Sequence, residues 1–295
     1  MILGVSIFSD NGESIRLPLR DFWGTGLAIT NITGLGPVKS DLWITNYGAQ
    51  SGGYYNGSRV GTRNIVMTIR PCGDDIEKIR RYAYRLFDVE EHVTLVVDTD
   101  YGDRRIDGYV ESFEVDLFSA AEQFVISILC PRPEFTDGSG VVLTSSSADT
   151  MNATFEFPFE SRWLMDDIEF GTPQDYAENI IHYSGEVPTG CEIHIDILSD
   201  PGKNVVIEGP RGSRVVVDNV NAVIKKDGRL VLNTVVGKRE AYYVKDGTRT
   251  DLAWTLWNQS NWPILYPGYN TIVVKTDNLY EVRMTCYYQN LYRGI

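Results

Sequence analysis

The chain has 295 residues, of which 43% are hydrophobic and 23% are charged, so it has a globular composition and enough length for two domains. Its formal net charge is −13, and no run of Lys or Arg is longer than two. We therefore do not expect tight electrostatic binding to DNA, because neutralising phosphates requires clustered basic side chains. The N-terminal residues lack the pattern of a signal peptide, and no apolar run approaches the about 18 residues that a membrane span needs.

We assign no element and no role to the first 22 residues. Three short β-branched runs at 26–36, 62–70 and 92–100 are bounded by Gly, Pro or Asp and predict strands. Between the last two, residues 72–88 predict a helix, and Asp74 with Glu77 three residues later predicts a capping box. Helical spacing places five apolar residues on one stripe: Ile76, Ile79, Ala83, Leu86 and Phe87.

Arg80, Arg81 and Arg85 lie outside the apolar stripe of this helix. A basic helix face can bind a phosphate-bearing partner. It can also be a solvated face that pairs with nearby acidic side chains, and this second interpretation is favoured.

Residues 37–61 form a long segment rich in Gly, Ser, Asn and Tyr between two predicted strands. Loops of this length are uncommon inside a compact domain and are usually functional or become ordered on assembly. We expect an interaction arm here, because four aromatic side chains are costly to leave in water; they are Trp43, Tyr47, Tyr54 and Tyr55.

Residues 104–135 predict a long hairpin that ends at a Pro-containing stop. In its second strand one face carries Phe124, Ile126, Ile128 and Cys130, and the opposite face still carries Val125 and Leu129. A hairpin with one face in water alternates more cleanly. We therefore expect the helix to cover the first face and a neighbouring subunit to cover the second.

Residues 136–150 are small and polar and predict a linker, so the expected domains are 1–135 and 151–295. Helix signals are essentially absent beyond the linker. Many short strands with turns between them predict an all-β sandwich; they are the runs 191–198, 204–209, 213–219, 229–234, 240–245, 270–276 and 280–288. The predicted turns include Asp-Gly at 227–228 and 246–247 and Asp-Asn at 277–278.

No motif of catalysis or cofactor binding appears, so we expect no enzyme activity, no cofactor and no metal site. The three histidines lack metal-binding spacing, although His182 and His194 could meet if their strands are adjacent. The cysteines lack CxxC spacing and predict buried free thiols; they are Cys72, Cys130, Cys191 and Cys286.

One aromatic cluster in the second domain remains open to three interpretations. Residues 254–269 hold Trp254, Trp257, Trp262, Tyr266 and Tyr269. They can form a small aromatic core beneath a loop, a protein contact, or a platform on which sugar rings stack.

The order of elements from 26 to 135 carries a family resemblance. The segment "LAITNITGLGPVKSDLWIT", the Arg-containing strand "GSRVGTRNIVMTI", the helix "DDIEKIRRYAYRLF" and the hairpin to "CPRPEF" resemble the distal tail protein (Dit) family of phages with long flexible tails. The segments "YSGEVPTG" and "YYQNLYRGI" also look like second-domain segments of tail proteins.

The resemblance implies a mostly β protein with an N-terminal α+β hub domain and a second domain that is galectin-like or similar to a carbohydrate-binding module. It implies a hexameric ring at the tail tip, assembled in the cytoplasm of the host bacterium. The implied partners are the tail tube protein and tail-associated hub or receptor-binding proteins, with DNA passing through the ring. An acidic balance suits such a conduit, since basic walls would retain DNA.

Two functions from other classes are alternatives. A carbohydrate-binding adhesin would hold a glycan on the loop from Trp254 to Tyr269 and would lose affinity in Trp257→Ala. A glycan hydrolase would lose turnover when a single carboxylate is changed.

Overall fold

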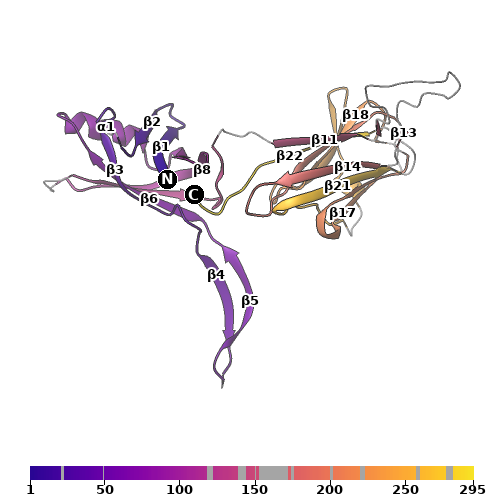
Figure 1. Ribbon diagram of the computed structural model, residues 1–295, viewed down its shortest axis with the longest axis horizontal. Helices are drawn as coiled ribbons and strands as arrows, with labels where there is room; N and C mark the ends of the chain where they lie inside the picture. The colour runs from indigo at the N-terminus through magenta and orange to yellow at the C-terminus, as the bar shows by residue number, and fades with distance from the viewer. Residues whose placement is uncertain are drawn as a thin grey trace, which may run out of the picture. The chain divides into compact units, whose positions relative to one another are not determined.

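The computed structural model describes residues 1–20, 23–48, 50–117, 122–138, 144–149, 151–152, 172–173, 176–199, 202–219, 223–256, 260–276 and 282–295. The chain divides into two compact units, the first formed by Met1–Val142 with Leu291–Ile295 and the second by Leu143–Asn290. The protein is mostly β, as expected from its strand patterns (Figure 1). Within the described ranges, no helix has the length and apolar character needed to cross a membrane.

The first unit is built on one antiparallel sheet. Its strand order is β2 (Ser14–Pro18), β1 (Ile2–Ser9), β7 (His92–Thr99), β8 (Arg104–Val115), β9 (Phe124–Cys130), β6 (Arg63–Pro71) and β3 (Leu27–Thr33), with β10 (Thr136–Asp137) beside β8. The three predicted strands and the predicted hairpin are confirmed as β3, β6, β7 and β8–β9.

Strands β1 and β2 come from the residues that predicted no element. The register of β1 against β7 shifts between Ile2 and Gly4. Because of this irregularity, Leu3 does not share the face of Val5 and Ile7, although the three apolar residues alternate in the sequence. Leu3 is consequently exposed, while Val5 and Ile7 are buried in the core.

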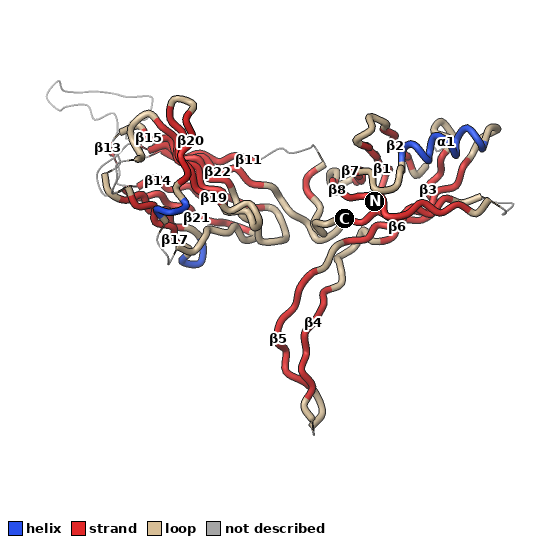
Figure 2. Tube along the Cα trace, turned by 180° about the vertical axis from the view of Figure 1, so that it is seen from behind, coloured by secondary structure: helices blue, strands red, loops and turns tan. Residues whose placement is uncertain are grey.

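Helix α1 (Ile76–Leu86) covers one face of this sheet (Figure 2). The predicted apolar stripe holds for Ala83, Leu86 and Phe87, which are buried, whereas Ile76 at the start of the helix is exposed. The stripe therefore meets the core only from its second turn onward.

The predicted cap of α1 is wrong by one residue. Asp75 is the N-cap, and its Oδ1 accepts a hydrogen bond from the backbone N–H of Lys78 at 3.0 Å. Glu77 stands two residues after this cap and pairs instead with Arg81 at 2.9 Å. The helix therefore has a single side-chain cap rather than the reciprocal pair of a capping box.

We expect Asp75→Ala to lower the free energy of unfolding of the first unit by about 1 kcal/mol, because it removes this cap. The neighbouring Asp74→Ala is the matched control and should change it by less than about 0.5 kcal/mol. Urea denaturation of both variants measures the difference, and equal effects would contradict the assignment of the cap.

The arginines of α1 pair with acidic side chains, which confirms the interpretation as a solvated face. Arg80 donates to both oxygens of Glu122, at 2.8 and 3.0 Å. Arg85 lies 3.7 Å from Glu13, and its carbonyl accepts a hydrogen bond from Asn11 at 2.6 Å.

The second unit contains two larger sheets and one small one. The six-stranded sheet has the order β11 (Thr144–Asp149), β22 (Val282–Tyr288), β15 (Glu192–Ile197), β18 (Gly228–Asn233), β19 (Glu240–Lys245) and β20 (Thr248–Asp251). The four-stranded sheet has the order β14 (Tyr176–Tyr183), β21 (Gly268–Thr276), β16 (Asn204–Glu208) and β17 (Arg214–Asp218). Strands β12 (Met151–Asn152) and β13 (Thr172–Pro173) pair with each other, and two short 3-10 turns span Pro210–Gly212 and Ala253–Thr255.

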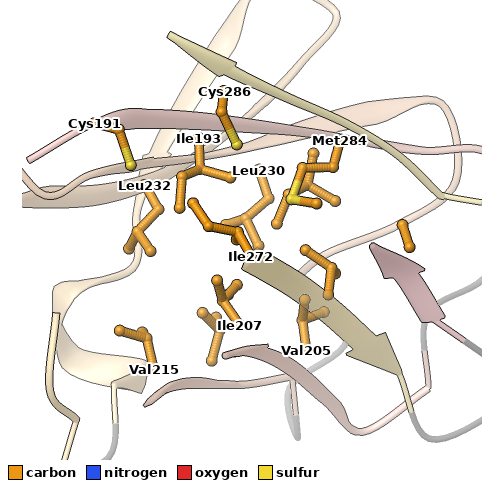
Figure 3. Close-up of a cluster of buried hydrophobic side chains, with 14 of the residues drawn as sticks. Cys191, Ile193, Val205, Ile207, Val215, Leu230, Leu232, Ile272, Met284 and Cys286 are labelled. Atoms are coloured by element: carbon orange, nitrogen blue, oxygen red, sulfur yellow. The ribbon is translucent and has the colours of Figure 1, made fainter. Parts of the chain in front are cut away.

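Both larger sheets bury side chains in one shared core (Figure 3). Ile193 and Leu230 come from the six-stranded sheet, and Val205, Ile207 and Ile272 come from the four-stranded sheet. All seven predicted strand runs of this region are strands. Regular alternation, as in β15, made them recognisable. Strand β14 alternates as regularly but was not among the predicted runs.

The turns predicted at 227–228 and 246–247 are confirmed. Asp246 and Gly247 have φ of 49° and 77°, and they join β19 to β20 as a two-residue hairpin turn. Asp227 likewise has φ of 63° immediately before β18. The predicted turn at Asp277 lies outside the described residues.

The expected linker 136–150 is not a separate irregular segment. Strand β10 within it pairs with β8, and β11 pairs with β22 of the second unit. The boundary between the two units falls between Val142 and Leu143, and the last five residues belong to the first unit. Polar composition misled the prediction, because strands whose side chains are small and polar give little apolar alternation.

The four cysteines are free, and three of them are buried. Burial raises the pKa of Cys130 and of Cys191 to about 12, and burial also raises the pKa of Cys286. These three thiols therefore stay protonated at pH 8, and a protonated thiol is a poor nucleophile.

We expect iodoacetamide at pH 8 to modify one thiol per folded chain, Cys72, which is partly exposed. Peptide mass spectrometry identifies the modified cysteine, and unfolding in guanidinium should expose all four. Rapid labelling of Cys130, Cys191 or Cys286 in the folded chain would contradict this burial.

Candidate interaction surface

The predicted arm is a β-hairpin. Strands β4 (Ser40–Asn46) and β5 (Gly53–Val60) form a two-stranded antiparallel sheet that pairs with no other described strand. The expectation of a long loop is therefore corrected, since only residues 47–52 at the tip connect the strands. Figure 2 shows the hairpin standing apart from the sheet of the first unit.

The arm exposes its large apolar side chains. The four predicted aromatics are between 52% and 63% exposed; they are Trp43, Tyr47, Tyr54 and Tyr55. The sequence analysis missed Leu42, Ile44 and Val60, which are exposed to 58%, 55% and 52%. Exposed large apolar side chains that are concentrated on one element indicate an interaction surface.

The arm has few internal contacts to stabilise it. The hydroxyl of Tyr55 donates to Ser58 at 2.7 Å, and the side-chain amide of Asn56 donates to Thr45 at 2.7 Å. All but two of the residues in β4 and β5 are exposed. An isolated two-stranded hairpin is marginally stable in water, so a surface that covers this one would stabilise it.

The second face of hairpin β8–β9 is only partly buried within the single chain. Phe124, Ile126 and Ile128 are fully buried on the first face, as expected. On the opposite face Val125 and Leu129 are half-buried, and the Ser127 hydroxyl between them is 9% exposed. This face is thus only partly apolar, and its cover by a neighbouring subunit remains a proposal.

Ser127 belongs to a polar group on that second face. Its hydroxyl lies 2.8 Å from a carboxylate oxygen of Glu111 on β8 and 3.0 Å from the side-chain oxygen of Asn64 on β6. These contacts link three neighbouring strands of the sheet through side chains as well as through the backbone.

The aromatic cluster of the second unit is dispersed. Trp254 is 63% exposed and Tyr269 is 81% exposed. Trp262 packs against the core, and the guanidinium of Arg211 lies 3.6 Å from the centre of the Tyr266 ring. Arg211 therefore covers one face of the Tyr266 ring, while Trp257 lies outside the described residues.

The histidines do not come together. His182 lies on β14 and His194 on β15, in different sheets, so the possible two-histidine site is excluded. His194 lies 2.5 Å from Glu192, and His92 lies 3.0 Å from Asp10. Over the described ranges, no group of three or more His, Cys, Asp or Glu residues is placed to hold a metal ion.

A hollow beside α1 has a volume of about 1020 Å³. It is bordered by charged residues that already have partners: Asp75 caps the helix, and Arg81 pairs with Glu77.

Comparison with solved structures finds a likeness of fold. The crystal structure of the SPP1 Dit (gp 19.1) protein, described as a paradigm of the hub adsorption apparatus in phages that infect Gram-positive bacteria, has a TM-score of 0.61. It is 13% identical in sequence, and the match covers 97% of this chain and 98% of that chain. The chain has the Dit fold.

Two chains from phage P2 baseplate structures in the activated conformation, with Ca and with Sr, are more distant. Both are 11% identical and have TM-scores of 0.42 and 0.39, over 97% and 96% of this chain and 98% and 97% of theirs. No protein-family model and no curated protein matches the sequence.

The Dit fold extends further than the sequence resemblance did. The sequence carried the resemblance over residues 26–135, whereas the match to SPP1 Dit covers both units. The resemblance to the Dit family is therefore confirmed as a likeness of fold.

Proposed function

We propose that the chain is a non-enzymatic structural protein of a phage tail tip. In this proposal an N-terminal α+β hub domain precedes a galectin-like β-sandwich, and six copies close into a ring. The ring joins the tail tube protein to tail-associated hub or receptor-binding proteins and lets DNA pass through its centre. Assembly takes place in the host cytoplasm.

The exposed arm in a chain with the Dit fold is the observation that carries this proposal. Its apolar side chains favour burial against another protein surface. A surface patch that meets a different patch on an identical copy gives a head-to-tail contact, and such contacts form a ring when the rotation closes. The net charge of −13 agrees with a conduit that does not retain DNA.

Electron microscopy of the virion tests the proposed location. Gold-labelled antibody fragments raised against the second unit should bind at the tail tip of particles of the phage that encodes this chain. Labelling at the head, along the whole tail or nowhere on intact and partly disassembled particles would contradict a tail-tip role. Particles of an unrelated phage provide the control.

The carbohydrate-binding alternative keeps one supporting observation, the exposure of Trp254 and Tyr269. If the chain is an adhesin, a glycan array should show saccharide binding that Trp254→Ala removes. We expect no such binding, because Arg211 stacks on the Tyr266 ring and Trp262 packs against the core.

A further inference from the structure

Arg63 is a buried arginine whose guanidinium donates hydrogen bonds to four backbone carbonyls. The side chain is 1% exposed. Its Nε donates to the carbonyl of Pro133 at 2.6 Å, and its Nη2 donates to the carbonyl of Arg293 at 2.7 Å. Its Nη1 donates to the carbonyls of Gly36, at 2.6 Å, and of Gly34. Four carbonyls from three separate segments therefore converge on one side chain.

Both ends of the β4–β5 arm lie next to Arg63. The segment with Gly34 and Gly36 leads into β4, which begins at Ser40, and Arg63 itself follows β5, which ends at Val60. Gly34 has φ of +85°, and a Cβ there would overlap the carbonyl oxygen of Asn64. The two ends of the arm are thus in direct contact, and Arg63 bonds one to the other.

The last five residues, Leu291–Ile295, complete the same site. Tyr292 and Phe135 exchange two backbone hydrogen bonds of 2.8 and 2.9 Å, and the Tyr292 hydroxyl donates to Asp137 at 2.9 Å. The N–H of Ile295 donates to the carbonyl of Leu35, between the two glycines at the arm base, at 3.2 Å. This segment consequently lies against the arm base as well as against Arg63.

The chemistry of the site requires arginine in particular. A guanidinium holds five N–H donors in a rigid plane, whereas a lysine ammonium is a point charge with three donors and cannot reach four diverging carbonyls. The Arg63 guanidinium also lies 4.5 Å from the centre of the Phe135 ring, whose face favours a cation. Burial lowers the pKa of Arg63. The four carbonyl dipoles stabilise the charged guanidinium in place of water.

We infer that Arg63 and Leu291–Ile295 form a clasp that fixes the base of the β4–β5 arm. Arg63 is therefore a positioning residue: it holds the arm at the angle from which it reaches its partner surface. The part of this inference that concerns assembly rests on the proposed function, whereas the clasp itself is a property of the single chain.

Hydrogen exchange followed by mass spectrometry tests the clasp in Arg63→Lys. We expect exchange at residues 34–40, 57–62 and 291–295 to accelerate on the order of 10-fold or more, because the arm base opens without unfolding of the unit. Exchange in the core strands β7 and β9 should stay within about 2-fold of the native chain. Arg80→Lys is the control, since Arg80 pairs with Glu122 away from the arm.

Gly294→Val tests the same clasp while leaving Arg63 in place. A Cβ at Gly294 would lie 3.1 Å from the carbonyl oxygen of Leu35 and 3.3 Å from the backbone of Gly36, so a valine should displace the segment. Gly24→Val is the matched control, because its Cβ would meet nothing within 4 Å. Gly294→Val should show the same pattern of faster exchange as Arg63→Lys, and Gly24→Val should not.

The outcomes separate the clasp from the proposed function. Uniformly faster exchange through the first unit in both variants, or no change in either, would overturn the clasp. If the native chain assembles and both variants assemble with unchanged affinity, the positioning role is overturned. If the native chain does not assemble but the local exchange pattern appears, the proposed function fails and the clasp stands.

Discussion

Replacing Trp43, Tyr54 and Tyr55 together with Ser should abolish self-association of the chain while leaving both folded units intact. Large aromatic side chains at the centre of an interface typically contribute 2 kcal/mol or more each. Three such losses should weaken association at least ~100-fold, even if the effects are not additive. The three side chains are exposed in the single chain, so its free energy of unfolding should change little. Sedimentation velocity measures the association.

The matched control for the arm carries the same three kinds of substitution elsewhere. Trp254, Tyr101 and Tyr269 are 63%, 92% and 81% exposed and lie outside the arm. Their replacement with Ser should leave association unchanged. Equal loss of association in both triple variants would show that general surface hydrophobicity, rather than the arm, drives assembly.

Phe124→Ala should lower the free energy of unfolding of the first unit by about 3–5 kcal/mol. Phe124 is fully buried, and its ring packs against Phe113, with the ring centres 5.5 Å apart. Removing the ring leaves a cavity that the rigid strands β6 and β8 on either side cannot close. Differential scanning calorimetry should show the transition of the first unit shifted to lower temperature.

Ile195→Ala provides the reciprocal measurement in the second unit. Ile195 is fully buried in the core shared by the two larger sheets, and its truncation should cost about 2–5 kcal/mol there. Val125→Ala, on the half-buried face of β9, should cost less than either. If each core substitution destabilised both transitions equally, the two cores would not be the independent units that the structure describes.

The strands and the helix were predictable where apolar side chains alternate against one core. Glu192–Ile197 alternates without interruption, and the stripe of Ala83, Leu86 and Phe87 has helical spacing. The helix start was wrong because two aspartates are adjacent, and only backbone geometry decides which of them accepts from Lys78. Strand β1 was not predicted, although Leu3, Val5 and Ile7 alternate in its sequence.

The candidate interaction surface was predictable in composition but not in geometry. Aromatic residues and glycines between two strands indicated the arm, yet an isolated hairpin has no core to impose alternation on its sequence. Arg63 stands at the start of an apolar strand and has no local feature that marks it as buried. Its partners Gly34, Pro133 and Arg293 are distant in the chain, so only the fold reveals the site.

The native mass of the purified chain, measured by mass photometry at two concentrations, tests most directly whether the chain alone closes into a six-membered ring. The account predicts a species of about 199 kDa, six times the 33.2 kDa of one chain, and its conversion to monomer in the arm variant. A native chain that remains a 33.2 kDa monomer at both concentrations, or that forms open polymers without a preferred size, would contradict a closed six-membered ring formed by the chain alone.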